Sequence, residues 1–151
     1  MLPALLVASS STVPAPGRPV VYALRHGQSE ANVLGIISSD PEVATVTHGL
    51  TPLGRESASA AAAEVIARAK DLGCGVAICS SDFLRARETA TIVHEAISAE
   101  GIPVWPSARV LLRRELRERH FGDFDGGPDS GYANVWREDA IDASRERHGV
   151  E

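Results

Sequence analysis

Two short apolar runs, each followed by a helical pattern, constrain the fold of this chain more than any other feature. The runs cover residues 20–24 and 76–79, and both lack the polar alternation of a half-exposed strand. Such runs are typical of strands buried on both faces. Strands that alternate with helices predict parallel pairing through right-handed crossovers. We therefore expect an α/β fold built on a parallel sheet.

The segments that follow the apolar runs carry helix signals. A helix is predicted over residues 51–72, because a Thr-Pro pair opens it and an Ala-rich run continues it up to a glycine. A second helix follows Ser81 or Asp82, either of which can cap it, and ends at Gly101. Residues 103–112 are then predicted to be extended.

Length and composition describe one ordinary globular domain. The chain has 151 residues, of which 44% are hydrophobic and 23% charged. Residues 1–19 are interpreted as a disordered or targeting leader, and residues 20–151 as the domain. No apolar run approaches the roughly 20 residues that span a bilayer. We expect a cytoplasmic location, with a cleaved targeting peptide as the alternative.

The formal charge of the chain is −5, which argues against a nucleic-acid surface. An anionic ligand must therefore meet a local cluster of cations. We predict no binding to nucleic acid or membrane, and the residues carry no signal for an oligomeric state. The spacing of Cys74 and Cys79 suits neither a zinc site nor a redox pair, so small buried thiols are expected.

The candidate chemistry lies where the predicted strands end. Parallel strands place their carboxyl ends along one edge, where ligands bind. Residues 25–27 and 80–82 are therefore expected to face each other across one crevice. His26 is well placed to act as a nucleophile there, with Gly27 allowing a ligand to approach the backbone. Arg25 can hold a phosphate by two parallel hydrogen bonds.

Two further segments could complete such a site. Arg85 lies in the first turn of the second helix, where it adds to the partial positive charge of the helix N-terminus. The alternative is that Arg85 and Arg87 pair with Glu88 or Asp82 on a solvated face. Residues 116–126 contain a carboxyl flanked by arginines and aromatics, which suits a general acid but also an ordinary charged loop.

The remaining chemical groups are assigned plainer roles. Asp123, Asp125 and Asp129 alternate without a nearby histidine array, which is more typical of a solvated loop than of a metal site. We therefore predict no metal and no cofactor. Tyr132 and Trp136 are interpreted as packing residues, although their i,i+4 spacing would also let them roof the site.

Four segments, taken in order, resemble motifs of the histidine phosphatase superfamily, in its phosphoglycerate mutase-like branch. Arg25–Asn32 is similar to the opening signature, Leu50–Gly54 to the start of the first helix, Ser80–Ala90 to the second phosphate motif and Leu116–Gly122 to the acid loop. The resemblance implies a three-layer α/β/α fold with a mostly parallel, phosphoglycerate mutase-like sheet. The C-terminal part of that fold is expected to be missing.

The resemblance also implies roles for individual residues. His26 would accept the phosphoryl group, and Glu118 would protonate the leaving oxygen. Arg25, Arg85 and Asn32 would hold the phosphoryl oxygens.

The family normally supplies a second histidine, in a His-Gly pair at the end of a late apolar strand. His48-Gly49 lies in a loop and His148-Gly149 follows a charged run, so neither matches that position. The chain is therefore interpreted as an incomplete domain, either a fragment or the product of a coding sequence that was assigned too short.

The predicted activity is metal-independent phosphomonoester hydrolysis through a phosphohistidine, on a small phosphorylated metabolite. His26 must be neutral, with one ring nitrogen held by a backbone carbonyl and the other facing phosphorus. Phosphoglycerate mutase-type transfer is the closest rival. Hydrolysis is favoured because residues 36–48 contain no Lys or Arg to clamp a second acidic group. A catalytically impaired phosphoryl-ligand binder and a metal-dependent hydrolase are two further hypotheses.

Overall fold

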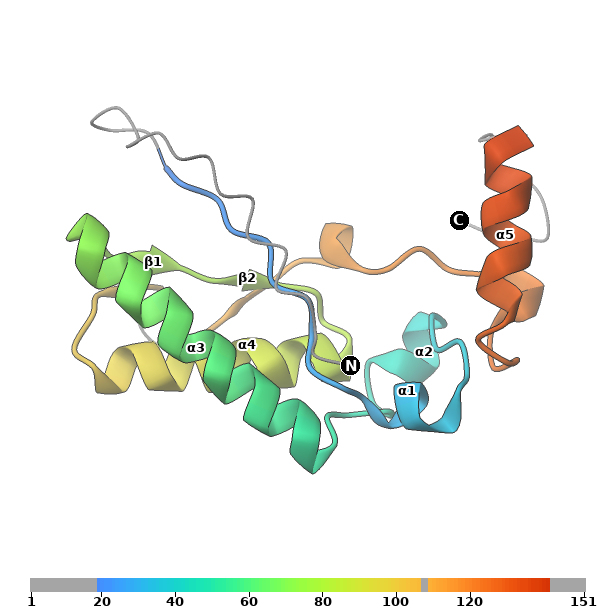
Figure 1. Ribbon diagram of the computed structural model, residues 1–151, viewed down its shortest axis with the longest axis horizontal. Coiled ribbons are helices and arrows are strands. Elements are labelled where there is room, and N and C mark those ends of the chain that lie inside the picture. The colour runs from blue at the N-terminus through green and yellow to red at the C-terminus, as the bar shows by residue number, and fades with distance from the viewer. Residues whose placement is uncertain (1–18, 107–108, 142–151) are drawn as a thin grey trace.

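The computed structural model describes residues 19–106 and 109–141 (Figure 1). The predicted leader, apart from Pro19, and His148 lie outside the described residues. The α-helices are α1 Glu30–Leu34, α2 Pro41–Ala44, α3 Pro52–Leu72, α4 Leu84–Ala99 and α5 Gly131–Ile141. The strands are β1 Val76–Ala77, β2 Cys79–Ser80, β3 Val104–Trp105 and β4 Leu111–Leu112. Single 3₁₀ turns are η1 Arg114–Leu116 and η2 Gly122–Phe124.

The first predicted helix is confirmed at both ends. The Thr51 hydroxyl accepts a hydrogen bond from the Gly54 N–H at 3.1 Å, which satisfies one of the free donors of the first turn of α3. Gly73 ends the helix in the left-handed conformation, with φ of 60°.

The second helix is confirmed, but its cap differs from the prediction. The N-cap position of α4 is Phe83, which has no side-chain acceptor. The Ser81 hydroxyl accepts from the Phe83 N–H at 3.2 Å, outside the helix proper. Asp82 is engaged elsewhere, because both of its carboxylate oxygens bind Arg117. An ion pair with a distant segment has displaced the local cap.

The strands confirm the α/β class and the parallel pairing. β1 pairs with β3 in parallel, with Val76 opposite Val104, and β2 pairs with β4 in parallel, with Ser80 opposite Leu112. Helices α3 and α4 contribute to one core on one side of these strands (Figure 1). The centre of that core is formed by Ala62, Val93 and Ile97, against which Val76, Ile78 and Val104 pack.

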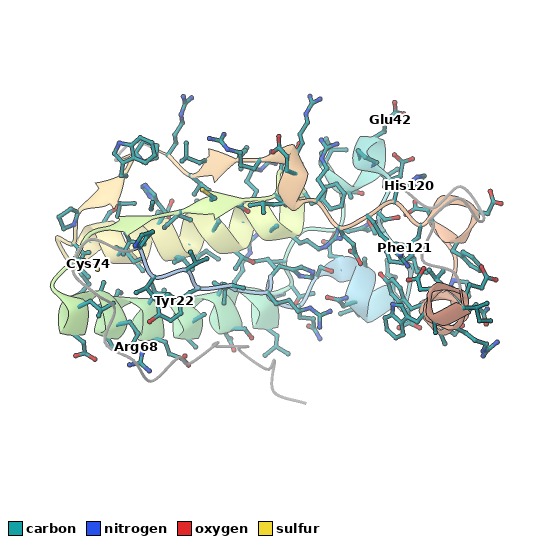
Figure 2. All side chains as sticks on the ribbon, turned by 90° about the horizontal axis from the view of Figure 1, so that it is seen from above. Tyr22, Glu42, Arg68, Cys74, His120 and Phe121 are labelled. Atoms are coloured by element: carbon teal, nitrogen blue, oxygen red, sulfur yellow. The ribbon has the colours of Figure 1, made fainter. Side chains whose placement is uncertain are left out.

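The prediction of a buried first strand over residues 20–24 is wrong. These residues are in no strand, and Val21 is 81% exposed. A strand forms only where its N–H and C=O groups pair with a neighbour, and residues 20–24 have no such pairing within the described chain. In the view of Figure 2, the segment that carries Tyr22 lies between α3 and the strands.

The prediction of buried thiols is also wrong, since Cys74 and Cys79 are both free and exposed. Side chains alternate along a strand, so Cys79 projects to the face opposite to that of Ile78, which packs in the core. Among the described residues, α3 and α4 cover only that core-facing side of the strands. Cys74 lies in the exposed turn after α3.

A second apolar cluster fastens α5 to the rest of the chain. Its buried members are Ile37, Phe121 and Val135, with Phe124 and Tyr132 packed against them. This cluster joins three segments that are far apart in the sequence. No helix among the described residues is long and apolar enough to cross a membrane.

Candidate active site

Pairing between β2 and β4 determines which segments meet. Both strands run in the same direction, so the segments that follow them leave the sheet at the same edge. The segment after β2 leads into α4 and Arg85, and the segment after β4 leads through η1 to Glu118. Arg85 and Glu118 form an ion pair there, with 2.9 Å between Nη2 and Oε2.

The loop that carries His26 is held against both long helices. The Gly27 N–H donates to the Thr89 hydroxyl on α4 at 3.2 Å. A Cβ added to Gly27 would lie 2.2 Å from the Gly54 carbonyl oxygen on α3. Gly27 therefore lacks a side chain because it packs against a neighbouring backbone. The expectation that it opens the backbone to a ligand is wrong, since Gly27 is buried.

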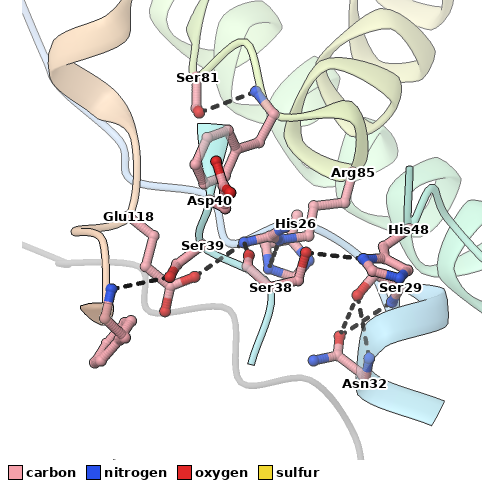
Figure 3. Close-up of polar contacts among 12 residues, drawn as sticks. His26, Ser29, Asn32, Ser38, Ser39, Asp40, His48, Ser81, Arg85 and Glu118 are labelled. Carbon is pink, nitrogen blue, oxygen red and sulfur yellow. Dashed lines mark hydrogen bonds and ion pairs between the residues drawn. The ribbon is translucent and has the colours of Figure 1, made fainter. Parts of the chain in front are cut away.

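His26 has a different partner for each ring nitrogen, and Figure 3 shows it beside one of them, Arg85. Nδ1 lies 2.7 Å from the Gly27 carbonyl oxygen, which can only accept, so Nδ1 carries the proton. Nε2 then accepts from the Arg85 Nε–H at 3.2 Å. Burial, together with the charges of Arg85 and Arg25, lowers the pKa of His26 to about 4 against the opposing hydrogen bond to Gly27. The ring is therefore neutral at pH 7, with a lone pair on Nε2.

Arg85 is the centre of the cluster. It is 4% exposed, and its guanidinium reaches His26, the Ser38 carbonyl oxygen at 3.0 Å and Glu118. Its third nitrogen, Nη1, is buried and has no hydrogen-bond partner within the described residues. A buried guanidinium N–H without an acceptor is costly, and an anion would satisfy it.

The alternative pairing of Arg85 with Glu88 or Asp82 is wrong. Glu88 accepts from the Leu50 N–H at 2.6 Å and from Arg55 at 2.8 Å. Asp82 binds Arg117. Both carboxylates are thus occupied, which leaves Arg85 for the site.

Arginines on either side fasten the segment around Glu118. Arg117 binds Asp82 in a bidentate pair with a 2.7 Å contact from Nε, and Arg119 binds Asp139 on α5 at 2.6 Å. The side chain of Glu118 is 37% exposed, so a substrate can reach it. This segment is therefore a fixed part of the site and not an ordinary charged loop.

Asn32 and Arg25 lie at the margin of this cluster. The Asn32 side-chain oxygen accepts from the Ser29 N–H at 3.0 Å in the capping box of α1, so its amide nitrogen remains a donor. Arg25 is exposed and makes no hydrogen bond or ion pair that joins it to the described residues. The structure thus brings His26 and Glu118 together through Arg85, which contacts both, whereas in the described part of the chain Asn32 and Arg25 make no hydrogen bond or ion pair with these three residues.

Sequence reasoning missed the serine turn that supports the cluster. The Ser38 carbonyl holds Arg85, and the Ser38 hydroxyl lies 2.8 Å from Nδ1 of His48, a residue with φ of 57°. The Ser39 hydroxyl donates to Asp125 at 2.6 Å and accepts from the Phe121 N–H at 2.9 Å. Asp125 is therefore an anchor of this turn, and its assignment to a solvated loop is wrong.

A Ser-Ser-Asp sequence occurs both at 38–40 and at 80–82, beside Arg85 in each case. Ser and Asp are typical of turns, so the sequence predicts a turn over residues 38–40 but not its contact with Arg85. No group of three or more His, Cys, Asp or Glu side chains in the described part of the chain could hold a metal ion.

Comparisons with known proteins found solved structures that are similar to this chain. A mycobacterial protein titled "Mycobacterial hydrolase 2" is 32% identical, with a TM-score of 0.56, over 83% of this chain and 48% of that chain. A mycobacterial glucosyl-3-phosphoglycerate phosphatase complexed with VO3 is 30% identical, with a TM-score of 0.52, over 83% of this chain and 53% of that chain. The chain thus spans about half the length of these solved structures.

A comparison with curated proteins gave no match. The family described as "Histidine phosphatase superfamily (branch 1)" matches residues 21–150. Since that match covers nearly the whole chain, the protein belongs to the histidine phosphatase superfamily.

Proposed function

We propose that this protein hydrolyses phosphomonoesters of a small metabolite through a phosphohistidine at His26, without a metal ion. The observation that carries the proposal is the pairing of a neutral His26, whose Nε2 holds a lone pair, with a buried Arg85 whose Nη1 has no partner within the described residues. A nucleophile and a cation without an acceptor, side by side, suit attack on a bound phosphoryl group.

The first step forms the phosphohistidine. Nε2 of His26 gives up the hydrogen bond from the Arg85 Nε–H and attacks phosphorus as the ester oxygen departs. A protonated Glu118 gives its proton to that oxygen. The phosphoryl oxygens are held by Arg85, with Asn32 and Arg25 at the margin as further donors. The Nδ1–H group keeps donating to the Gly27 carbonyl oxygen, which holds the ring in its orientation.

The second step releases phosphate. Glu118, now ionised, takes a proton from water, and the water oxygen bonds to phosphorus as the P–N bond breaks. His26 returns to its neutral form and Glu118 regains its proton. Arg85 contacts both His26 and Glu118, so one cation serves both steps.

Hydrolysis is preferred to mutase-type transfer. The segment over residues 36–48 contains no Lys or Arg that would clamp a second acidic group of a transferred substrate. The similarity to a glucosyl-3-phosphoglycerate phosphatase supports a phosphorylated sugar or sugar acid as the substrate. We place the reaction in the cytoplasm and propose no nucleic-acid partner.

A phosphoryl-ligand binder with impaired catalysis is the second candidate. It would keep Arg25, Arg85 and Asn32 as phosphoryl ligands, and it is favoured by the hydrogen bond that the lone pair on Nε2 of His26 already accepts from Arg85. Such a binder would hold phosphate or vanadate through Arg85 but would form no phosphohistidine.

A rapid quench with labelled aryl phosphate tests the proposal. We expect acid-labile, base-stable phosphate on the parent chain and none on His26→Ala. The variant is expected to fold, because His26 belongs to neither apolar cluster, and circular dichroism checks this. Equal labelling of the variant and the parent would exclude His26, and oxyanion binding without any labelling would favour the impaired binder.

Leaving-group dependence tests Glu118. Glu118→Gln cannot supply a proton, so it should slow hydrolysis of alkyl phosphates far more than that of 4-nitrophenyl phosphate, whose aryl oxide departs without one. Uniform slowing of both substrates would make Glu118 a structural residue.

A further inference from the structure

Tyr132, in the first turn of α5, contacts the segment that carries Glu118. Its hydroxyl lies 3.4 Å from Oε1 of Glu118. Its ring meets the edge of Phe121 at a centroid distance of 4.9 Å and stacks on Trp136 at 5.6 Å. The ring is therefore held by aromatic neighbours from two elements, which fixes the position of the hydroxyl.

The start of α5 is itself tightly placed. A Cβ on Gly131, the residue before Tyr132, would lie 3.2 Å from side-chain carbons of both Ile37 and Phe124. The ion pair between Arg119 and Asp139 ties a later turn of α5 to the same segment. The distance between Tyr132 and Glu118 is thus set by contacts on both sides of the pair.

The two carboxylate oxygens of Glu118 have different neighbours. Oε2 accepts from the Arg85 guanidinium, which always carries a charge and has no acceptor. A proton on Oε2 would oppose that cation, so the proton of the acid form belongs on Oε1. Tyr132 is the residue beside that oxygen.

We propose that Tyr132 is a positioning residue for the proton donor, and that its hydroxyl follows Oε1 of Glu118 through both steps of the reaction. A phenol both donates and accepts. It accepts from Oε1–H while Glu118 is protonated and donates to Oε1 after Glu118 ionises. Burial first, and then the charge of Glu118, raise the pKa of Tyr132 to about 12, so the hydroxyl keeps its proton at neutral pH. The role rests on the proposed function of Glu118.

Tyr132→Phe tests the role because it keeps the ring and removes only the hydroxyl. We expect hydrolysis of 2-glycerophosphate, with its alkoxide leaving group, to slow about tenfold, which corresponds to one hydrogen bond. Hydrolysis of 4-nitrophenyl phosphate and the affinity for vanadate should stay near those of the parent. Tyr22→Phe is the matched control, since Tyr22 is the only other tyrosine and lies far from Phe121 (Figure 2).

The same assays in a Glu118→Gln background complete the test. If the hydroxyl acts through Glu118, adding Tyr132→Phe to Glu118→Gln causes no further loss. Additive losses, or equal slowing of both substrates by Tyr132→Phe, would overturn the role of Tyr132. Leaving-group selectivity in Glu118→Gln but not in Tyr132→Phe would refute Tyr132 alone. No selectivity in Glu118→Gln would refute the proposed function of Glu118 and the positioning role together.

Discussion

Replacing Arg85 by lysine keeps the positive charge but removes the planar guanidinium that contacts His26, Ser38 and Glu118. In the parent, Nε binds His26, Nη2 binds Ser38 and Glu118, and Nη1 has no partner within the described residues. A single ammonium on a flexible stem cannot reproduce these directions. Arg85→Lys therefore tests whether the guanidinium geometry, and not the charge alone, binds the phosphoryl group.

The expected magnitude follows from the contacts that are lost. Loss of one charge-assisted hydrogen bond to the oxyanion costs about 1.5–3 kcal/mol, which weakens vanadate binding roughly 10-fold to 150-fold. The Ser38 carbonyl, on a residue that is 4% exposed, would lose its guanidinium partner. That loss lowers the free energy of unfolding by about 1–3 kcal/mol.

Calorimetric titration with vanadate measures the first effect and urea denaturation the second. Arg87→Lys, the same change two residues further along α4, is the matched control, because Arg87 lines a groove with Arg55 and Glu95 and does not contact His26. Equal vanadate affinity in Arg85→Lys and the parent would refute the clamp. An equal loss in Arg87→Lys would show that the effect does not depend on the position of Arg85 beside His26 and Glu118.

Three further predictions concern the supports of the site. Gly27→Ala should lower the free energy of unfolding by at least about 2 kcal/mol, because its Cβ would lie 2.2 Å from the Gly54 carbonyl oxygen; unchanged urea denaturation would contradict that packing. The folded-state pKa of His26, about 4, lies below its ordinary value of 6.5. Neutral His26 therefore makes its full contribution to the free energy of unfolding above about pH 6.5. This contribution, up to about 3 kcal/mol, is lost as the pH falls towards 4. Denaturation at pH 7 and pH 5 should show a smaller pH dependence in His26→Gln, and an equal slope in both proteins would exclude this source. Asp125→Ala leaves the buried Ser39 hydroxyl and N–H without their acceptor. The free energy of unfolding should fall by about 2 kcal/mol, which lowers the melting temperature by several degrees. An unchanged melting temperature would show that water replaces the carboxylate.

The sequence by itself determined the features that depend on neighbouring residues. The limits of α3 follow from Thr51 and Gly73, because both caps act within one turn. The Thr51 hydroxyl accepts from a backbone N–H, and Gly73 adopts the left-handed conformation that ends the helix. Parallel pairing was predicted from the alternation of strands and helices, but the pairs that form are β1 with β3 and β2 with β4, without residues 20–24. The predicted approach of His26 to the segment after β2 is observed as its contact with Arg85. The family motifs predicted His26, Arg85 and Glu118, and in the structure Arg85 contacts the other two.

Only the tertiary structure decided which partner each group takes. The residues around Asp82 do not show that it binds Arg117 instead of capping α4. Those around Asp125 do not show that it accepts a hydrogen bond from Ser39. The apolar run over residues 20–24 forms no described strand, because pairing requires a second strand as well as a β-prone sequence. These outcomes depend on distances between remote segments, which folding fixes and local residue patterns do not encode.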